Sequence, residues 1–205
     1  MNLFINYLFE KPEYFFYVVL AVGFSVCVHE YCHARAALAL GDPTAAQLGH
    51  LTLNPLKQMG WFSIVMLLIL GICWGAVPVN PHLVSPRRRA LIALAGPLSN
   101  LGLFVFSLLL FAGALAFHLP LALSFILILG MMNLVLFFIN ILPIPGFDGG
   151  AVLLAFFPVA RWRDNELVKG IMIGMVILLF TCIQYIFAAA YWVMGGCIHF
   201  IQKLV

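Results

Sequence analysis

Long runs of apolar residues constrain the fold of this 205-residue chain more than any other feature. Several runs approach or exceed the ~20 residues that an α-helix needs to cross a bilayer, and they cover about 14–40, 90–117, 121–141 and 167–190. Only 8% of the residues are charged, whereas a soluble domain carries roughly 25%. We therefore predict an all-α fold, a polytopic membrane helical bundle in a single integral-membrane domain over 1–205.

The apolar run at about 61–77 decides the predicted topology. As a helix it would reach only about 25 Å, which is short of the ~30 Å hydrocarbon core. If it enters the membrane and returns, Arg35, Lys57 and the basic run 87–89 share one face. If it crosses instead, the basic run lies opposite Arg35 and Lys57. The positive-inside rule favours the re-entrant alternative, with the N-terminus outside and the basic loops in the cytosol.

The two ends of the chain need separate interpretation. The first apolar run lacks a basic segment before it and a small-residue cleavage pattern after it, so we expect a retained span rather than a signal peptide. A single helix over 167–204 would be about 57 Å long, too long for one span. Since Gly195 and Gly196 offer a bend, we predict a span at about 167–190 and a short C-terminal helix at about 191–204. The prediction totals about five to six membrane segments.

The stretch "VCVHEYCHA" places His29, Glu30 and His33 within the first apolar run. On a helix, residues four apart lie on the same face one turn apart, so the two imidazoles can bind one metal ion. Glu30 flanks that ion without ligating it, where a carboxylate can take a proton from a metal-bound water. This HExxH pattern is typical of zinc metalloproteases. Ionisable groups inside a span are costly, which favours a functional role over satisfied core polar residues.

A zinc site of this type needs a third protein ligand, and eight residues offer one: Cys27, Cys32, Asp42, His50, His82, His118, Asp148 and His199. Asp148 is favoured because Pro143 and Pro145 open the backbone just before it, and two glycines follow it. Irregular backbone at membrane depth is tolerated where it lines a wet cavity. The alternative is that Asp148 only caps a short helix. Cys32 is unassigned and is interpreted as a helix-packing residue.

Two asparagines accompany these groups. Asn100 lies about two turns into an apolar span, and Asn140 closes the span before the proline break. Either amide could stabilise an oxyanion or orient a metal ligand. Each could equally form an interhelical hydrogen bond, which is common for asparagine in membranes.

Four motifs together resemble the site-2 protease family of intramembrane zinc metalloproteases. They are "HEYCH", "GHLTLNP", "AGPLSN" and "NILPIPGFDGG", in this order over roughly residues 23–158. The resemblance implies that His29, His33 and Asp148 hold one Zn²⁺ per chain and that Glu30 is the catalytic base. It also implies a helical bundle with the zinc nearer the cytosolic side of the membrane. Many relatives carry a PDZ or CBS module, and we expect this chain to be a short form without one.

The same resemblance implies hydrolysis of peptide bonds within or beside transmembrane segments of membrane proteins, by zinc-activated water with Glu30 as general base. We expect single-span substrates and a prokaryotic cytoplasmic membrane. A helical substrate must unwind before cleavage, so we expect short extended segments near the zinc site. The candidates for contact with such a strand are "LPIPG" at 142–146 and the stretch His50, Leu51, Thr52, Leu53 and Asn54.

Other functions fit the sequence less well. A divalent-metal transporter would need polar residues along a continuous route and repeated halves, which are not seen in the sequence. A catalytically inactive metal-binding relative would not need the carboxylate of Glu30 beside an open position. The only dense basic run is a topology signal, so no nucleic-acid partner is expected. Substrate identity and oligomeric state stay open.

Overall fold

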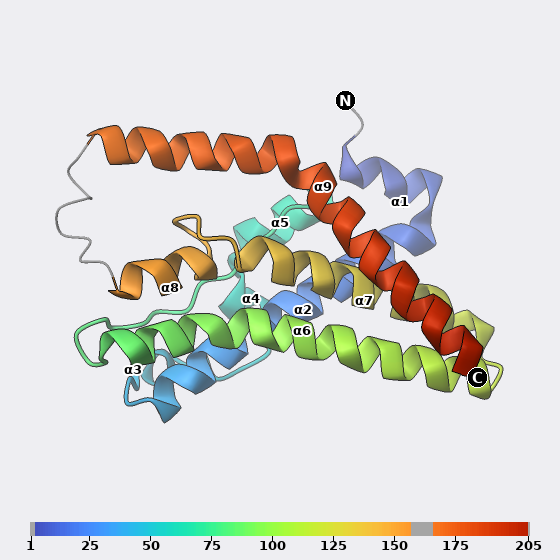
Figure 1. The fold of residues 1–205 in the computed structure, drawn as a ribbon, viewed down its shortest axis with the longest axis horizontal. Helices are drawn as coiled ribbons and strands as arrows, with labels where there is room; N and C mark the ends of the chain where they lie inside the picture. The colour runs from blue at the N-terminus through green and yellow to red at the C-terminus, as the bar shows by residue number, and fades with distance from the viewer. Residues whose placement is uncertain (1–2, 157–165, 205) are drawn as a thin grey trace.

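The computed structural model describes residues 3–156 and 166–204 and is helical throughout its regular parts (Figure 1). Its elements are η1 (Phe4–Asn6), α1 (Tyr7–Glu10), α2 (Pro12–Ala39), α3 (Thr44–Gln47), α4 (Pro55–Gln58), α5 (Gly60–Leu70), α6 (Pro86–Ala116), α7 (Pro120–Asn140), α8 (Asp148–Phe156) and α9 (Glu166–Leu204). No β-strand occurs in the described ranges. The predicted all-α helical bundle is therefore confirmed.

Four of the described helices are long and apolar enough to cross a membrane, and this makes the chain a membrane protein. The spans are Pro12–Ala39, Pro86–Ala116, Ala122–Asn140 and Ile183–Leu204. Prolines begin α2, α6 and α7. Proline is well tolerated at the first helical position, because its missing N–H has no partner there anyway and its φ is already helical.

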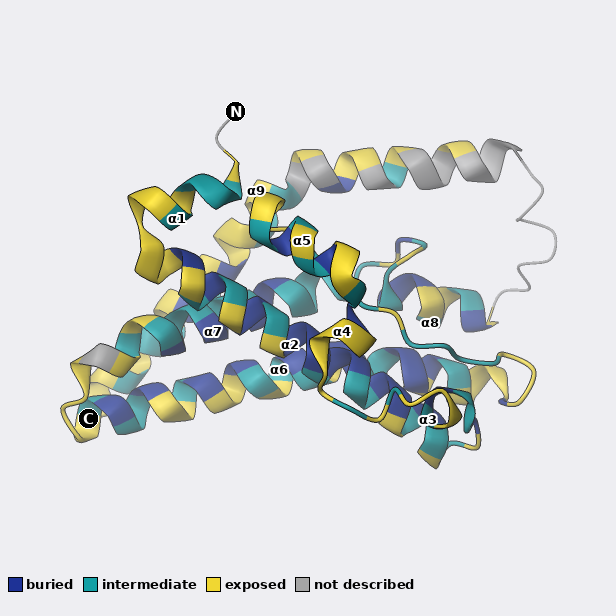
Figure 2. Cartoon of the chain, turned by 180° about the vertical axis from the view of Figure 1, so that it is seen from behind, coloured by how far each residue is buried: buried dark blue, intermediate teal, exposed yellow. Residues whose placement is uncertain are grey.

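Helix α2 lies at the centre of the bundle. Half of its most apolar 18-residue window is buried, against 28% in α6, 33% in α7 and 11% in α9. Figure 2 shows buried residues along α2 where α6 and α7 pack against it. Because α6 and α7 are joined by a short turn at 117–119, they run antiparallel and enclose α2 from one side. Polar residues of α2 in this position are shielded by neighbouring helices.

Helix α5 and the segment after it run along α2 and return. Leu67 of α5 packs in the apolar cluster with Val22 and Val26 of α2. With 11 residues, α5 is about 16 Å long and cannot cross a bilayer. Gly71 ends it in the left-handed conformation at φ 73°. The predicted apolar run at 61–77 is therefore helical only in its first part.

The segment 71–85 returns beside α5 without regular structure, and three hydrogen-bonded anchors hold it. The Trp74 N–H donates to Ser63 Oγ, and Ser63 Oγ donates to the Trp74 carbonyl. The Ala76 N–H donates to the Gln58 carbonyl at 3.2 Å. The third anchor is Asp42, which lies just after α2.

Asp42 ties the segment to the end of α2. Its side chain is fully buried, and its Oδ2 accepts from the Asn80 N–H at 2.6 Å while its Oδ1 accepts from the Thr44 N–H at 3.0 Å. Burial alone would raise the pKa of Asp42, but the hydrogen bonds from Thr44 and Asn80 lower the pKa overall. Asp42 is therefore an anchor for the backbone, and in the described residues it does not belong to a group of side chains that could hold a metal ion.

Helix α9 differs from the prediction for the C-terminal run. It continues as one helix through Gly195 and Gly196, so no separate helix at 191–204 is found. Within α9, Ile183–Leu204 is long and apolar enough to cross a membrane, and the span at about 167–190 stays a prediction. In lipid, a break in the helix leaves backbone N–H and C=O groups without hydrogen-bond partners. The free-energy cost of these unpaired groups favours a continuous helix, even though two glycines make the backbone more flexible. Figure 1 shows instead that α9 changes direction before its final part.

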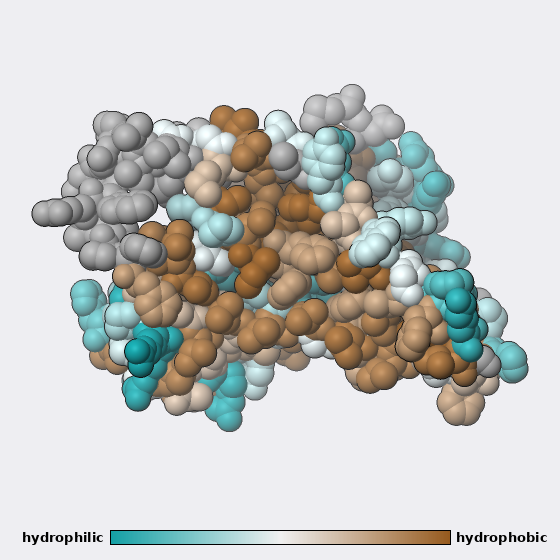
Figure 3. All heavy atoms as spheres, in the orientation of Figure 1, coloured by the Kyte–Doolittle hydropathy of each residue, from teal (hydrophilic) through white to brown (hydrophobic). Residues whose placement is uncertain are grey.

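One face of the molecule is apolar across its middle. Figure 3 shows apolar side chains over the centre of one face, with hydrophilic residues gathered mostly toward its two ends. Among the exposed side chains are Phe106 and Leu109 of α6 and Tyr191 and Trp192 of α9. In water such a surface would aggregate, whereas in a bilayer the same side chains are solvated by lipid.

Candidate metal centre

Two imidazoles on α2 point their Nε2 atoms at the same spot. His29 Nε2 and His33 Nε2 lie 3.0 Å apart, as expected for residues one turn apart on the same helix face. Both side chains are buried, with 6% and 7% of their surface exposed. Two unprotonated ring nitrogens this close repel each other unless a cation lies between them, so the pair suits a metal ion.

Asp148, which is distant in the sequence, brings a carboxylate to the two Nε2 atoms. Its Oδ2 lies 3.0 Å from His29 Nε2, and its Oδ1 lies 3.2 Å from His33 Nε2. The three residues form the group of potential metal ligands in the described part of the chain, with ligand atoms within 4.8 Å of one another. For zinc bonds of ~2.0 Å to nitrogen and oxygen, a tetrahedron has edges of about 3.3 Å. The observed separations are close to that spacing.

The outer partners of the imidazoles leave both Nε2 atoms available as ligands. His33 Nδ1 lies 2.7 Å from the Ile92 carbonyl, and His29 Nδ1 lies 2.6 Å from Asn100 Oδ1. A carbonyl oxygen only accepts, so His33 carries its proton on Nδ1. With the Nδ1 proton on both rings, the two Nε2 atoms and Asp148 are all acceptors. Asp148 Oδ2 is buried and has no hydrogen-bond donor in the described structure, and a cation satisfies such a group.

Helix α6 is shaped to approach the imidazoles closely. Gly96 faces them, and a Cβ at this position would collide with the ring atoms of His29 and His33. Pro97 follows inside the helix. A proline at this position cannot donate to the carbonyl four residues earlier, which belongs to Ala93, the neighbour of Ile92. The glycine of the motif "AGP" lets α6 pass against the two imidazoles, where the Ile92 carbonyl accepts from His33.

The break after α7 places Asp148 in the site. α7 ends at Asn140, and Asp148 is the first residue of α8. Cβ atoms on Gly149 or Gly150 would collide with the backbone carbonyls of residues 141, 142 and 144. The carboxylate of Asp148 therefore meets the two Nε2 atoms at the start of α8, where an ionised carboxylate suits a cation.

Glu30 lies beside the ligand group without joining it. It is buried, with 7% of its surface exposed, and it interacts electrostatically with both imidazoles and with Asp148. Gly75 of the returning segment packs against its side chain, since a Cβ on Gly75 would collide with the Glu30 carboxylate. The segment 71–85 thus covers Glu30 and limits its movement.

Asn100 and Asn140 occupy different environments. Asn100 bonds His29 and donates to Asn133 Oδ1 at 3.0 Å, so it is placed to orient a ligand. Asn140 is half-buried at the end of α7 and forms no side-chain hydrogen bond with the rest of the described chain. An oxyanion role for Asn140 stays a prediction. Asn133, fully buried in α7, is a polar residue that the sequence reasoning missed. Its isolated amide within an apolar span was the available signal.

The stretch His50–Asn54 is irregular backbone rather than a strand. Gln58, which is almost fully buried, donates to the carbonyl oxygens of His50 and Thr52. Asn54 caps α4 by accepting from the Leu56 N–H at 2.9 Å. These carbonyls already have partners inside the chain. Contact between this stretch and a substrate strand therefore stays a prediction. Cys32 is a half-buried free thiol outside the ligand group.

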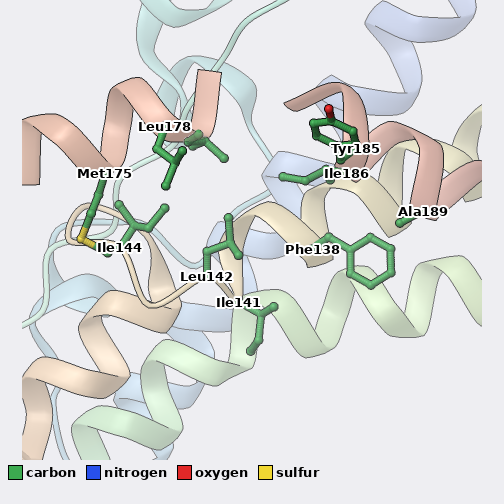
Figure 4. Close-up of a pocket in the computed structure, with 10 residues that line it drawn as sticks. Phe138, Ile141, Leu142, Ile144, Met175, Leu178, Tyr185, Ile186 and Ala189 are labelled. Atoms are coloured by element: carbon green, nitrogen blue, oxygen red, sulfur yellow. The ribbon is translucent and has the colours of Figure 1, made fainter. Parts of the chain in front are cut away.

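An apolar cavity of about 470 Å³ lies beside the chain segment that leads to Asp148. Figure 4 shows Leu142 and Ile144 of this segment facing Met175 and Leu178 of α9 across it. Its lining is almost wholly apolar. The cavity therefore suits an apolar side chain or a lipid tail rather than a polar solute.

Curated proteins that are similar to this chain share one description, "Putative zinc metalloprotease". YwhC of Bacillus subtilis is 38% identical over 152 residues, which cover 69% of each chain. Rip2 of Mycolicibacterium smegmatis is 32% identical over 198 residues, covering 87% of this chain and 73% of the relative. MJ0611 of Methanocaldococcus jannaschii is 33% identical over 172 residues, covering 73% and 77%.

No family model matches the chain, and no solved structure matches it. The assignment therefore rests on the curated relatives, several of which exceed 30% identity over more than two thirds of both chains. Their shared description agrees with a buried group of two histidines and one aspartate on membrane helices. The chain belongs to the family of zinc metalloproteases that these relatives represent, in agreement with the resemblance of its sequence to site-2 proteases.

Proposed function

We propose that this protein is an intramembrane zinc metalloprotease, which cleaves peptide bonds within or next to transmembrane segments of membrane-protein substrates. The observation that carries the proposal is the ligand group His29, His33 and Asp148, which is buried between helices long enough to cross a membrane. A membrane-spanning segment can lie at the same depth as such a site, which supports a membrane-protein substrate.

His29 Nε2, His33 Nε2 and an Asp148 oxygen would hold the zinc ion, which leaves a fourth position open. When bound, zinc polarises the scissile carbonyl and lowers the pKa of a coordinated water toward ~7. Glu30 acts as general base: its carboxylate accepts the proton of the attacking water and then delivers it to the nitrogen of the leaving amine. The packing of Gly75 on Glu30 supports this role by restricting the carboxylate to one side of the site.

The proposed substrate is a single-span membrane protein. The apolar cavity beside residues 142 and 144 supports this choice, because it can accept an apolar side chain from a membrane segment near the metal centre. The apolar outer surface of the bundle gives such a segment access through lipid. The proposed location is the cytoplasmic membrane of a prokaryote, with the active site nearer the cytosol.

The shape of α5 supports the re-entrant topology. Hydrogen bonds of Ser63 with Trp74 and of Gln58 with Ala76 hold the segment after α5 beside the segment before it. In the proposed topology, the chain therefore enters and leaves the membrane on the side where α2 ends and α6 begins. We place this side in the cytosol, because it carries Lys57 and the basic run 87–89.

The general-base role is tested by Glu30→Gln in purified protein reconstituted with a membrane-protein substrate. We expect one zinc per chain in both wild type and variant, because Glu30 is not a ligand, and a loss of cleavage of at least about 100-fold. Glu13→Gln is the matched control, since Glu13 is exposed in the first turn of the same helix. It should cleave like wild type.

Two results would contradict the proposal. Wild-type cleavage rates in Glu30→Gln would exclude this carboxylate as the base. Zinc uptake into proteoliposomes by wild-type protein, without cleavage of any membrane substrate, would favour a metal transporter instead. Membrane proteomics that compares wild type with Glu30→Gln should identify substrates as single-span proteins that accumulate in the variant.

A further inference from the structure

A chain of buried amide and hydroxyl groups leads away from His29. Asn100 Oδ1 lies 2.6 Å from His29 Nδ1, and Asn100 Nδ2 donates to Asn133 Oδ1 at 3.0 Å. Asn133 Nδ2 donates in turn to Ser25 Oγ at 2.8 Å. Ser25, Asn100 and Asn133 each have 0% of their surface exposed. Water therefore cannot replace any of these partners, and the direction of every hydrogen bond depends on its neighbours.

The groups farthest from His29 determine which atom donates and which accepts in each of these hydrogen bonds. Asn133 Nδ2 also donates to the Leu129 carbonyl at 2.9 Å, and a carbonyl oxygen can only accept. Ser25 donates its own proton to the Ala21 carbonyl at 2.6 Å, which leaves its oxygen as an acceptor. The NH₂ group of Asn133 must therefore face Leu129 and Ser25. Its oxygen must face Asn100.

This orientation is passed on to the histidine. Because the oxygen of Asn133 needs a donor, Asn100 presents its NH₂ group and turns its own oxygen toward His29. That oxygen can only accept, so the proton of neutral His29 lies on Nδ1 and the lone pair lies on Nε2. Nε2 is the atom that faces His33 and Asp148.

We infer that Asn133 is a positioning residue for the metal centre, which holds Asn100 in the orientation that selects the metal-binding tautomer of His29. The inference rests on the proposed role of His29 as a metal ligand. Without Asn133, the Asn100 amide is free to rotate end for end. Its NH₂ group would then face His29 Nδ1 and favour the proton on Nε2, where it blocks metal binding.

The test compares zinc binding in purified full-length variants in detergent, with zinc alone as the probe. Asn133→Leu replaces the amide with an apolar group of similar size. Competition with a chromophoric chelator should show the zinc dissociation constant rising between about tenfold and a hundredfold. The visible spectrum of the cobalt-substituted protein should also change, because the geometry at His29 changes.

Leu134→Ala is the control for general damage to α7. Leu134 is the next residue, is 3% exposed, and belongs to an apolar cluster with Phe104 and Met194 rather than to the hydrogen-bonded chain. This variant should lower the thermal midpoint and leave zinc affinity unchanged. A purely structural role of Asn133 predicts that both variants behave alike.

A second pair of variants, made in Asn100→Asp, distinguishes an effect on the orientation of residue 100 from an effect on the packing of α7. In Asn100→Asp the carboxylate has two equivalent oxygens, so it accepts from His29 Nδ1 in either rotation and no longer depends on Asn133. Adding Asn133→Leu to Asn100→Asp should therefore change zinc affinity by no more than about twofold, within the usual range for independent sites.

An unchanged zinc affinity in folded Asn133→Leu would overturn the inference. It would also be overturned if Asn133→Leu lowered zinc affinity equally in wild type and in Asn100→Asp. If Asn133→Leu does not fold, Ser25→Ala removes one of the two acceptors that hold Asn133. It should weaken zinc binding in the same direction, and an unchanged affinity would again overturn the inference. If wild type binds no zinc, or if His29→Ala binds it equally well, the proposed metal site fails instead.

Discussion

Gly96 shows how one residue shapes the candidate metal centre. It brings the backbone of α6 against the imidazoles of His29 and His33, where a Cβ would collide with ring atoms of both. In a membrane, helices associate through such close packing and through interhelical hydrogen bonds rather than through the hydrophobic effect. The glycine therefore sets both the approach of α6 and the space left for a metal ion.

Gly96→Ala should lose zinc at chelator concentrations that leave wild type loaded, because the methyl group displaces one or both imidazoles. The expected loss of zinc affinity is at least about tenfold, measured by competition with a chelator. Gly102→Ala is the matched control in the same helix, since a Cβ there meets nothing within 4 Å. It should keep zinc and gain roughly 0.5–1 kcal/mol of helix stability. Equal zinc affinity in both variants would contradict the packing argument.

Among the secondary-structure elements, the turn from α7 to α8 does most to position the site. It carries Asp148 to the histidines of α2 across 115 residues of sequence. Two glycines make this possible, since Gly149 and Gly150 lie directly against backbone carbonyls of the 141–144 segment. Backbone atoms cannot move aside as the end of a flexible side chain can, so a side chain larger than that of glycine does not fit at either position.

Gly149→Ala should therefore displace α8 and remove Asp148 from the ligand group. We expect loss of bound zinc, measured by elemental analysis of purified protein, together with a lower thermal midpoint. Ala151→Gly is the comparison, because Ala151 is exposed in the same helix. That change costs roughly 0.5–1 kcal/mol of helix stability but leaves the close contact intact, so zinc should stay bound. Full zinc occupancy in Gly149→Ala would exclude this account of the turn.

For the molecule as a whole, the consistent feature is that every group of the site lies toward one end of the bundle. The site lies near the C-terminal end of α2, the N-terminal end of α6 and the segment after α7. Because α2, α6 and α7 alternate in direction, these three ends fall at the same end of the bundle. Asp42 and the returning segment 71–85 close that end over Glu30.

Cysteine labelling from each side of the membrane tests this arrangement, in a background with the native cysteines replaced. Lys57→Cys and Arg88→Cys should both react from the cytosolic side, as the proposed re-entrant topology of the 61–77 region requires. Phe117→Cys, in the turn between α6 and α7 with 77% of the residue exposed, should react from the opposite side. Labelling of positions 57 and 88 from opposite sides would mean that the 61–77 region crosses the membrane.

Local patterns in the sequence were enough for much of this protein. Apolar runs predict membrane helices because lipid leaves the backbone no partners other than its own. The spacing of His29 and His33 predicts a shared face because helix geometry is fixed. The choice of Asp148 followed from prolines and glycines that exclude regular helix around it. In each case the physical cause acts within a few residues, so the sequence alone contains it.

The tertiary structure alone decided what depends on contacts between distant segments. It showed that Asn100 meets both His29 and Asn133, that Gly75 lies on Glu30, and that Gly96 faces the imidazoles. It also kept α9 continuous through its two glycines. Amide partners and close approaches are set by how helices pack, and the apolar patterns of these helices are too uniform to specify that packing. The sequence alone was therefore enough to predict the candidate ligands, and only the helix packing decides how those side chains are held.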